Sequence, residues 1–388
     1  MQTQQELGLV TDEHSGLSRR SLFKKSAAAM GLLAIGTGIY EGGSLVPAWA
    51  SGQSGPTATP NTPRAAALNI IQTNVRMYSG AIVPHWSYQD PINPLARAVP
   101  GPWLVATQGE IVSLTIKNNT TSAHGWWIPG VTGATTGSLA AGASKTITFT
   151  APAAGTYLYG DPVLEPIGRL LGLQGVLTVM PATGITPYST PSPAIQTLFS
   201  DLSSPQYHNG YPWDRTRQWV WLFNQVDPVL HTAIIVNKKV YTAATFQAAF
   251  KPRYFTINGL SGFDSAHSPD VEINGFEGEP ALIRMVNGGL ANHSPHIHGN
   301  HCYTLARNGV IQSNLQWRDA WHLAGGERID VLLPYTMPPD VERWPPLSDA
   351  HFPMMYPMHC HMEMSQTSNG GDYPNGAVTH WLLEGPKR

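Results

Sequence analysis

The chain has 388 residues, of which 12% are charged, and its formal net charge is −2. This near-neutral balance argues against nucleic acid as a partner, because binding to phosphates requires a cluster of Lys and Arg. A charged fraction this far below the usual ~25%, together with 38 Gly and 33 Pro, indicates a loop-rich β protein and disfavours a helical one.

The N-terminus has the pattern of an export signal. The twin arginines Arg19 and Arg20 precede an apolar run, SAAAMGLLAIGTGIY, and an AWA site at residues 48–50. These are the basic, apolar and cleavage regions of a twin-arginine signal. The run is shorter than the ~20 apolar residues of a membrane span, and it is rich in Gly and Ala, so a membrane anchor is disfavoured. We predict that residues 1–50 are removed and that the mature protein is periplasmic or otherwise exported, with no membrane span.

The rest of the chain predicts two all-β domains. Residues 51–68 are a Pro-, Ser- and Gly-rich leader that we expect to be flexible. Short alternating or β-branched runs then follow, in the order EIVSLTIKN, SKTITFTA, GTYLYG and GVLTVM, and later QWVWLFNQ, RYFTING, ALIRMVNGG, RIDVLLPY and VTHWLLEG. Such runs, separated by Gly, Asn and Pro, are typical of β-sandwich strands. We predict sandwiches over residues 69–182 and 216–388, joined by a linker at 183–215.

Histidines concentrate in two segments of the second domain. NHSPHIHGNH contains His293, His296, His298 and His301, and MHCH contains His359, Cys360 and His361. Imidazole and thiolate together suit copper or zinc. The alternative for the histidines is that they are structural residues of the core.

Strand geometry divides these residues into two groups. Successive side chains of a strand point to opposite faces, so His359 and His361 face one way and Cys360 faces the other. His296 and His298 share a face, whereas His293 would face with Cys360. The alternation predicts an all-imidazole site beside a thiolate–imidazole site, although Pro295 could interrupt the strand.

The two cysteines of the chain, Cys302 and Cys360, leave a second interpretation open. In an oxidising compartment, a disulfide between them is the alternative to a metal thiolate. Met364 lies an even number of residues after Cys360 on the same segment, and its thioether is a soft ligand that suits copper. The alternative for the methionines of this segment is gap-filling in the core.

These segments resemble motifs of the multicopper oxidases. HSPHIHG is similar to their H-P-x-H-L-H-G motif, and HCH is similar to their H-C-H-x-x-x-H motif. In the first domain, PGPWLVATQGEIVSLTIKNNTTSAHGWWIPG resembles the run that leads to H-W-H-G, and GTYLYGDP resembles G-T-Y-W-Y-H-S-H. The resemblance covers nearly all of the chain after the signal. It implies Greek-key cupredoxin domains, a type 1 copper that accepts electrons from substrate, and a trinuclear copper cluster that reduces dioxygen. For two-domain members it also implies a homotrimer.

The copper-ligand motifs are incomplete in this chain. The resemblance implies metal ligands at His124, His293, His296, His298, His359, Cys360 and His361, with Met364 as a further candidate. Trp126, Gly160 and Pro162 stand where three cluster ligands belong, and Ser365 stands where the second type 1 histidine belongs. Serine is a poor copper ligand, and the other three side chains cannot ligate copper. For His124, a satisfied core histidine is the alternative to ligation.

The resemblance therefore implies an exported copper-dependent oxidoreductase with an atypical copper centre and a small-molecule or metal-ion electron donor. The number of copper ions stays open. So do two alternatives: a copper-binding protein without turnover, and a metal-free cupredoxin scaffold that binds a protein partner.

Overall fold

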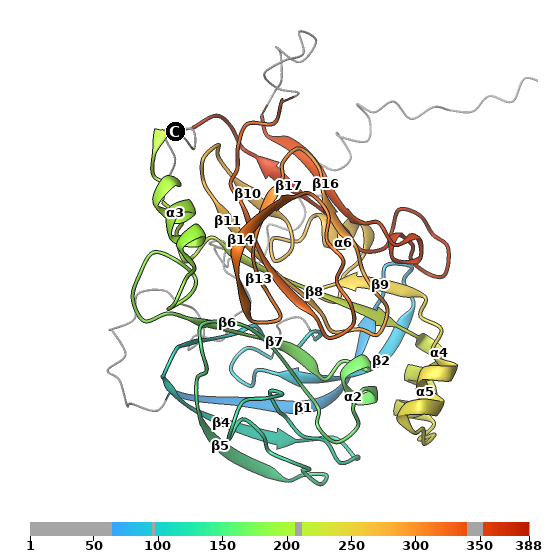
Figure 1. The fold of residues 1–388 in the computed structure, drawn as a ribbon. Helices are drawn as coiled ribbons and strands as arrows, with labels where there is room; N and C mark the ends of the chain where they lie inside the picture. The colour runs from blue at the N-terminus through green and yellow to red at the C-terminus, as the bar shows by residue number, and fades with distance from the viewer. Residues whose placement is uncertain (1–63, 95–97, 206–211, 340–351, 388) are drawn as a thin grey trace, which may run out of the picture. The chain divides into compact units, whose positions relative to one another are not determined.

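The structure is a computed structural model that describes residues 64–94, 98–205, 212–339 and 352–387. The predicted signal peptide, and residues 51–63 of the predicted leader, lie outside the described residues. All described residues belong to one compact unit (Figure 1). Within the described ranges, no helix is long and apolar enough to cross a bilayer.

Residues 64–180 form two sheets. In the first, β1 (Arg64–Arg76) lies between β2 (Ile82–Gln89) and β4 (Ile111–Asn118), and β5 (Ser144–Thr150) follows β4 at the edge. The second has the order β3-β7-β6, from Leu104–Thr107, Gln174–Met180 and Gly155–Gly160. Leu114 and Ile116 from the first sheet share one buried core with Leu177 and Val179 from the second.

Residues 218–383 form two more sheets. The larger has the order β14-β13-β15-β11-β8-β9, with strands at Val310–Arg318, Cys302–Arg307, Arg328–Leu333, Ala281–Asn287, Gln218–Val226 and Tyr254–Ile257. The smaller has the order β10-β17-β16-β12, with strands at Ile273–Gly275, Val378–Leu383, Met354–Cys360 and Pro295–Ile297. Trp221 and Ile283 from the larger sheet pack in one core with Met358 and Trp381 from the smaller.

The predicted all-β fold is confirmed, and each of the nine predicted runs contains a strand. The predicted leader, residues 51–68, extends too far, because β1 begins at Arg64 and pairs in parallel with β4 over Ala66–Leu68. The bare run of alanines in this segment has no alternation that would identify a strand, so only its pairing with β4 defines it.

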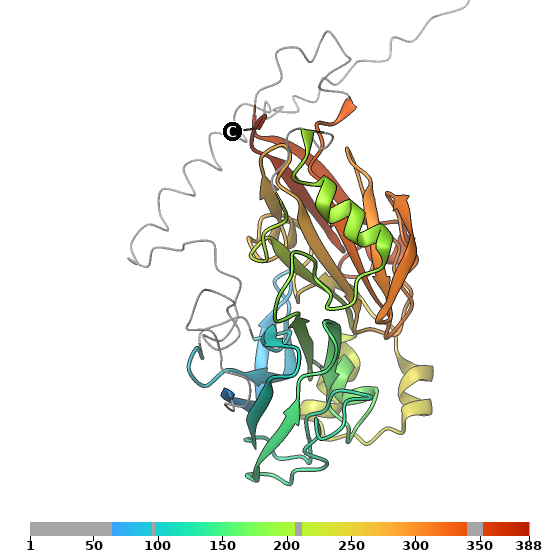
Figure 2. The same ribbon diagram turned by 60° about the vertical axis from the view of Figure 1, so that its left-hand side comes forward.

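The predicted linker contains structure that the sequence did not suggest. Helix α3 (Pro193–Asp201) is capped by the Ser192 hydroxyl and lies against β14 (Figure 2). Its Ile195, Leu198 and Phe199 are buried. The sheets divide the chain between β7 and β8, while the domain boundaries themselves stay a prediction.

A helical insertion follows β8. It consists of α4 (Pro228–His231), a π-helical turn η2 (Thr232–Val236) and α5 (Ala243–Ala249). Its Leu230, Ile235 and Phe246 are buried in the core of residues 64–180, not in the core of their own half. The part of the chain that the structure describes contains three further short helices, α2 (Ile167–Leu170), α6 (Gly262–Ala266) and η4 (Glu363–Gln366).

Candidate metal centre

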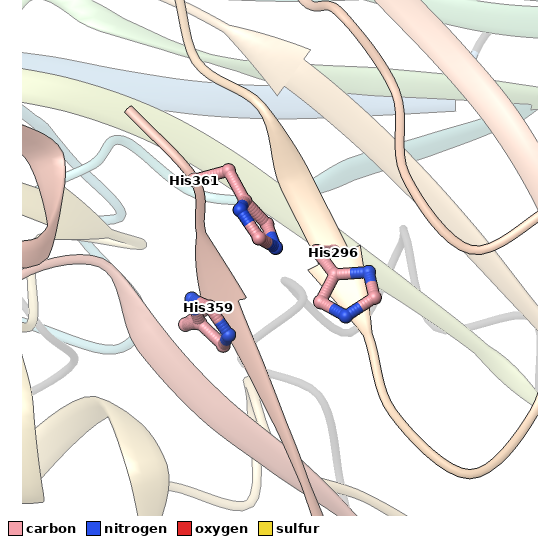
Figure 3. Close-up of side chains that lie close together, drawn as sticks. All are labelled: His296, His359 and His361. Atoms are coloured by element: carbon pink, nitrogen blue, oxygen red, sulfur yellow. The ribbon is translucent and has the colours of Figure 1, made fainter. Parts of the chain in front are cut away.

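Three imidazoles converge where β12 meets β16. These strands are antiparallel, and their register places His296 opposite His359. The ring nitrogens that His296, His359 and His361 can offer all lie within 4.8 Å of one another (Figure 3). Among the described residues, this is the one group of three or more His, Cys, Asp or Glu side chains with such a spacing.

His298 extends the group to four rings. Its Nε2 lies 3.2 Å from Nε2 of His359, and its ring centroid lies 4.5 Å from that of His296. The structure thus brings together the four histidines that strand alternation assigned to one face. We call His296, His298, His359 and His361 the imidazole cluster. His298 and His361 are exposed and the other two are half-buried.

The ring of His296 is oriented by the backbone. Its Nδ1 lies 2.9 Å from the carbonyl oxygen of Asp319, which can only accept, so Nδ1 donates and Nε2 keeps a lone pair. Histidine ligands of metals commonly have their second ring nitrogen held in this way. The sequence carried no signal for Asp319, because any residue at this position could supply the carbonyl.

Electrostatics favour the neutral form of two rings of the cluster, His298 and His359. Burial, followed by the neighbouring imidazoles, lowers the pKa of His298. Burial is also the main cause that lowers the pKa of His359. Neutral imidazoles present lone pairs, and a set of nitrogen donors with one exposed side suits copper or zinc. The cluster therefore fits the copper that the sequence motifs imply.

Cys360 and His293 form a separate pair on the buried face. The Cys360 Sγ lies 3.6 Å from Nδ1 of His293, and both side chains are fully buried. The backbone N–H of Ser294 donates to the same sulfur at 3.2 Å. Burial raises the pKa of the Cys360 thiol, and hydrogen bonds from Ser294, Met362 and Ser365 partly oppose this. The alternative of a disulfide is not what the structure shows, because Cys302 and Cys360 are both free.

The structure does not bring Met364 to this pair. Its side chain is 63% exposed, whereas Cys360 is fully buried. The reason is that the strand ends at Cys360 and the chain turns into η4, so the alternation on which the Met364 prediction depended stops. Ser365 is the residue of η4 that turns inward, and its hydroxyl bonds to Cys360.

Gln225 is a site residue that the sequence analysis missed. It lies in β8, is fully buried, and its Nε2 is 2.6 Å from Nε2 of His293. Its Oε1 accepts the backbone N–H groups of Leu290 at 2.7 Å and Ala291 at 3.0 Å. The available signal was weak, because Gln225 follows another polar residue, Asn224, at the end of the run QWVWLFNQ.

His124 lies apart from the imidazole cluster, in the first half of the chain. Its Nδ1 is 2.8 Å from Oδ2 of Asp161, and both side chains are fully buried. Its Nε2 is buried without a hydrogen-bond partner. Trp126, which replaces a ligand in the motif, is part of the core. The prediction that His124 is a metal ligand stays a prediction, since the structure joins it to none of the other predicted ligands.

Comparison with known proteins shows the fold. No family model matches the sequence, and no curated protein matches it. A blue copper oxidase from Nitrosomonas europaea superposes with a TM-score of 0.62 at 18% identity, over 83% of this chain and 86% of the other. A multicopper oxidase named mgLAC gives 0.59 at 19% identity, over 84% and 86%. A copper nitrite reductase from Nitrosomonas europaea gives 0.53 at 18% identity, over 83% and 94%.

At these identities the likeness concerns the fold and not the activity. It agrees with the motifs quoted above on architecture, since both point to cupredoxin-type sandwiches. The chain thus has the cupredoxin-type β-sandwich fold that is found in multicopper oxidases and copper nitrite reductases.

Proposed function

We propose that the protein is an exported copper-dependent oxidoreductase whose atypical copper centre is the imidazole cluster. The observation that carries this proposal is the convergence of His296, His359 and His361, whose nitrogens lie within 4.8 Å of one another. The copper enzymes named among the structural neighbours support the choice of copper over zinc.

Each residue of the cluster has a role in this proposal. His296, held by the Asp319 carbonyl, and His359, opposite it across the strand pair, would form the fixed part of the centre. His298 and His361 would complete it from the solvent side, where a small-molecule or metal-ion electron donor can approach. Copper bound there would supply one-electron redox chemistry.

The proposed centre would have fewer copper ligands than the full set that the motifs of the multicopper oxidases imply. Trp126 is packed in the core, and His124 is bonded to Asp161 within its own half of the chain. Four-electron reduction of dioxygen by this chain alone has little support, so a copper-binding role without turnover is the competing outcome.

We also propose that copies assemble as a homotrimer. The resemblance of the two-domain chain to the multicopper oxidases supports this assembly, in which the side of His298 and His361 would stay open to the electron donor. Light scattering of the copper-loaded protein would show three times the monomer mass, and a monomer at micromolar concentration would contradict the proposal.

The test is metal content followed by turnover. The mature protein, loaded with Cu(II) and desalted, is expected to retain copper that His359→Ala/His361→Ala loses. Removal of a single outer partner of a ligand typically costs roughly 10–100-fold in metal affinity, so loss of two ligands at one site should weaken copper binding by about a hundredfold or more. His267→Ala, which removes an exposed histidine outside the cluster, is the matched control and should retain the metal.

Oxygen consumption with phenolic and cuprous donors then separates the outcomes. Uptake that depends on the cluster supports the oxidoreductase. Copper retention without turnover would favour sequestration. Equal copper contents in wild type and the double variant would contradict the proposed centre.

A further inference from the structure

We infer that Cys360 and His293 do not hold copper, because Gln225 fixes His293 in the tautomer whose Nδ1 carries the proton. The buried pair would then be a hydrogen-bonded structural element in the place where the sequence motifs imply a type 1 copper. This inference is independent of the imidazole cluster, which lies on the opposite face of β16.

The argument begins with the orientation of the Gln225 amide. Its Oε1 accepts two backbone N–H groups, from Leu290 and Ala291. A flipped amide would point an NH₂ group at two donors and leave all of them buried and unsatisfied, at a cost of about 1–3 kcal/mol for each group. The NH₂ group must therefore point at Nε2 of His293, 2.6 Å away.

The packing leaves Gln225 little freedom. A Cβ on Gly289 would lie 2.1 Å from both the Nε2 and the Oε1 of Gln225, so the amide occupies the space that any other side chain there would need. Gln225 is also fully buried. Rotation of the amide away from His293 would require movement of the backbone that carries Leu290 and Ala291.

The orientation of Gln225 determines the tautomer of His293. An amide NH₂ can only donate, so Nε2 of His293 must accept and carries no proton. A ring whose Nε2 accepts a hydrogen bond is neutral, so the single proton of His293 lies on Nδ1. This N–H points to the Cys360 sulfur at 3.6 Å. A protonated nitrogen has no lone pair for copper.

The sulfur is also engaged. It accepts the Ser294 N–H at 3.2 Å and a hydrogen bond from the Ser365 hydroxyl. Ser365 stands where a second imidazole would be needed, and Met364 points to solvent. Copper would find one sulfur and no free nitrogen, which is too few ligands for a stable thiolate site.

One functional consequence follows. Without a copper thiolate at Cys360, electrons cannot enter through the buried face of β16. A reductant would have to reach the imidazole cluster directly, on the side where His298 and His361 are exposed.

The tautomer can be measured in the unmodified protein. Long-range ¹H–¹⁵N correlation spectra of the mature, metal-free protein labelled with ¹⁵N-histidine distinguish Nδ1–H from Nε2–H rings. The His293 signals are identified by their loss in His293→Gln. We expect the Nδ1–H pattern for His293, and an Nε2–H pattern would overturn the inference.

The copper readout uses the visible thiolate-to-copper charge-transfer band of Cu(II)-loaded protein. Wild type and Ser365→His are expected to lack the band. Ser365→His/Gln225→Leu, which supplies a second imidazole and removes the donor that holds His293, is expected to gain it, and adding Cys360→Ser should abolish it.

A band in wild type that Cys360→Ser removes would overturn the inference. A band in Ser365→His as intense as in the double variant would do the same, because Gln225 would then not be the obstacle. These outcomes are distinct from failure of the imidazole cluster, which is scored by copper content and not by this band.

Discussion

Asp161 is a buried residue that forms hydrogen bonds at a place where the motif would require two copper ligands. It lies between Gly160 and Pro162, the two positions where the motif would require copper ligands. Its carboxylate accepts from Nδ1 of His124, from the backbone N–H of Gly125 at 2.9 Å, and from that of Val163 at 3.0 Å. These three hydrogen bonds stabilise the turn.

Asp161→Ala is therefore expected to leave buried donors unpaired and to lower the free energy of unfolding by about 3 kcal/mol. Asp161→Asn keeps Oδ1 for the two backbone donors and should lose about 1 kcal/mol. Urea unfolding of the metal-free protein measures both. Equal stability of wild type and Asp161→Ala would contradict this account of the turn.

The candidate site was predictable at the residue scale to the extent that strand alternation held. The separation of the imidazole cluster from Cys360 and His293 followed from the two-residue period of strands. Gln225 could not be found in this way, because its partners Leu290, Ala291 and His293 are more than sixty residues away in sequence. Met364 was misplaced because the strand ends before it.

At the scale of elements, the insertion α4–η2–α5 joins the two halves of the chain. His231, at the end of α4, donates from Nδ1 to the carbonyl of Pro84 in β2 at 2.8 Å. Its ring centroid lies 4.3 Å from that of His85, also in β2. Burial lowers the pKa of His231 to about 4 and also lowers that of His85, with the neighbouring His231 as the second cause.

This arrangement predicts acid sensitivity. Unfolded histidine binds a proton below a pH of about 6.5, whereas folded His231 stays neutral until a pH of about 4. The contribution of His231 to the free energy of unfolding is therefore fully present above pH 6.5. It is lost as the pH drops from 6.5 to 4, which lowers the free energy of unfolding by about 3 kcal/mol.

His231→Gln keeps a donor for the Pro84 carbonyl and removes the titration. The free energy of unfolding of this variant, measured in urea at a series of pH values, should depend on pH less steeply between pH 6 and 5 than that of the wild type. The difference in slope should correspond to nearly one proton fewer taken up on unfolding. His322→Gln, which changes an exposed histidine, serves as the control. A slope equal to that of wild type would contradict the assignment of acid sensitivity to His231.

The helices of the insertion could not be predicted from the sequence. Its helices are four to seven residues long, too short for the period of an amphipathic helix to be recognised. They are stabilised by burying Leu230, Ile235 and Phe246 in the core of the first half. This packing is a tertiary effect that no local pattern records.

At the scale of the whole molecule, a buried carboxylate joins three segments that are distant in sequence. Asp330 in β15 accepts from Thr156 in β6 at 2.6 Å and from Tyr188 in the predicted linker at 2.9 Å. It also pairs with the fully buried Arg284 in β11 at 3.1 Å. Asp330 thus links β6 of the first half and Tyr188 of the segment between the halves to the second half of the chain.

Asp330→Asn is expected to lower the free energy of unfolding by about 3–5 kcal/mol, because it leaves the Arg284 guanidinium buried without a counter-charge. Arg284→Met/Asp330→Leu removes both charges and should be more stable than Asp330→Asn. Calorimetry of the three proteins tests this order. A double variant less stable than Asp330→Asn would show that the polar network matters beyond charge compensation.

The sequence by itself determined the all-β class, the positions of nine strands and the residues of the imidazole cluster. It could do so because these features depend on local periodicity and on motifs within a few residues of one another. Tertiary structure decided which nitrogen of His293 faces Cys360, what Asp161 binds, and where the insertion α4–η2–α5 packs. These outcomes depend on contacts between segments far apart in the chain. Such contacts form because a buried donor or acceptor cannot bond to water and must use the partner that the fold provides.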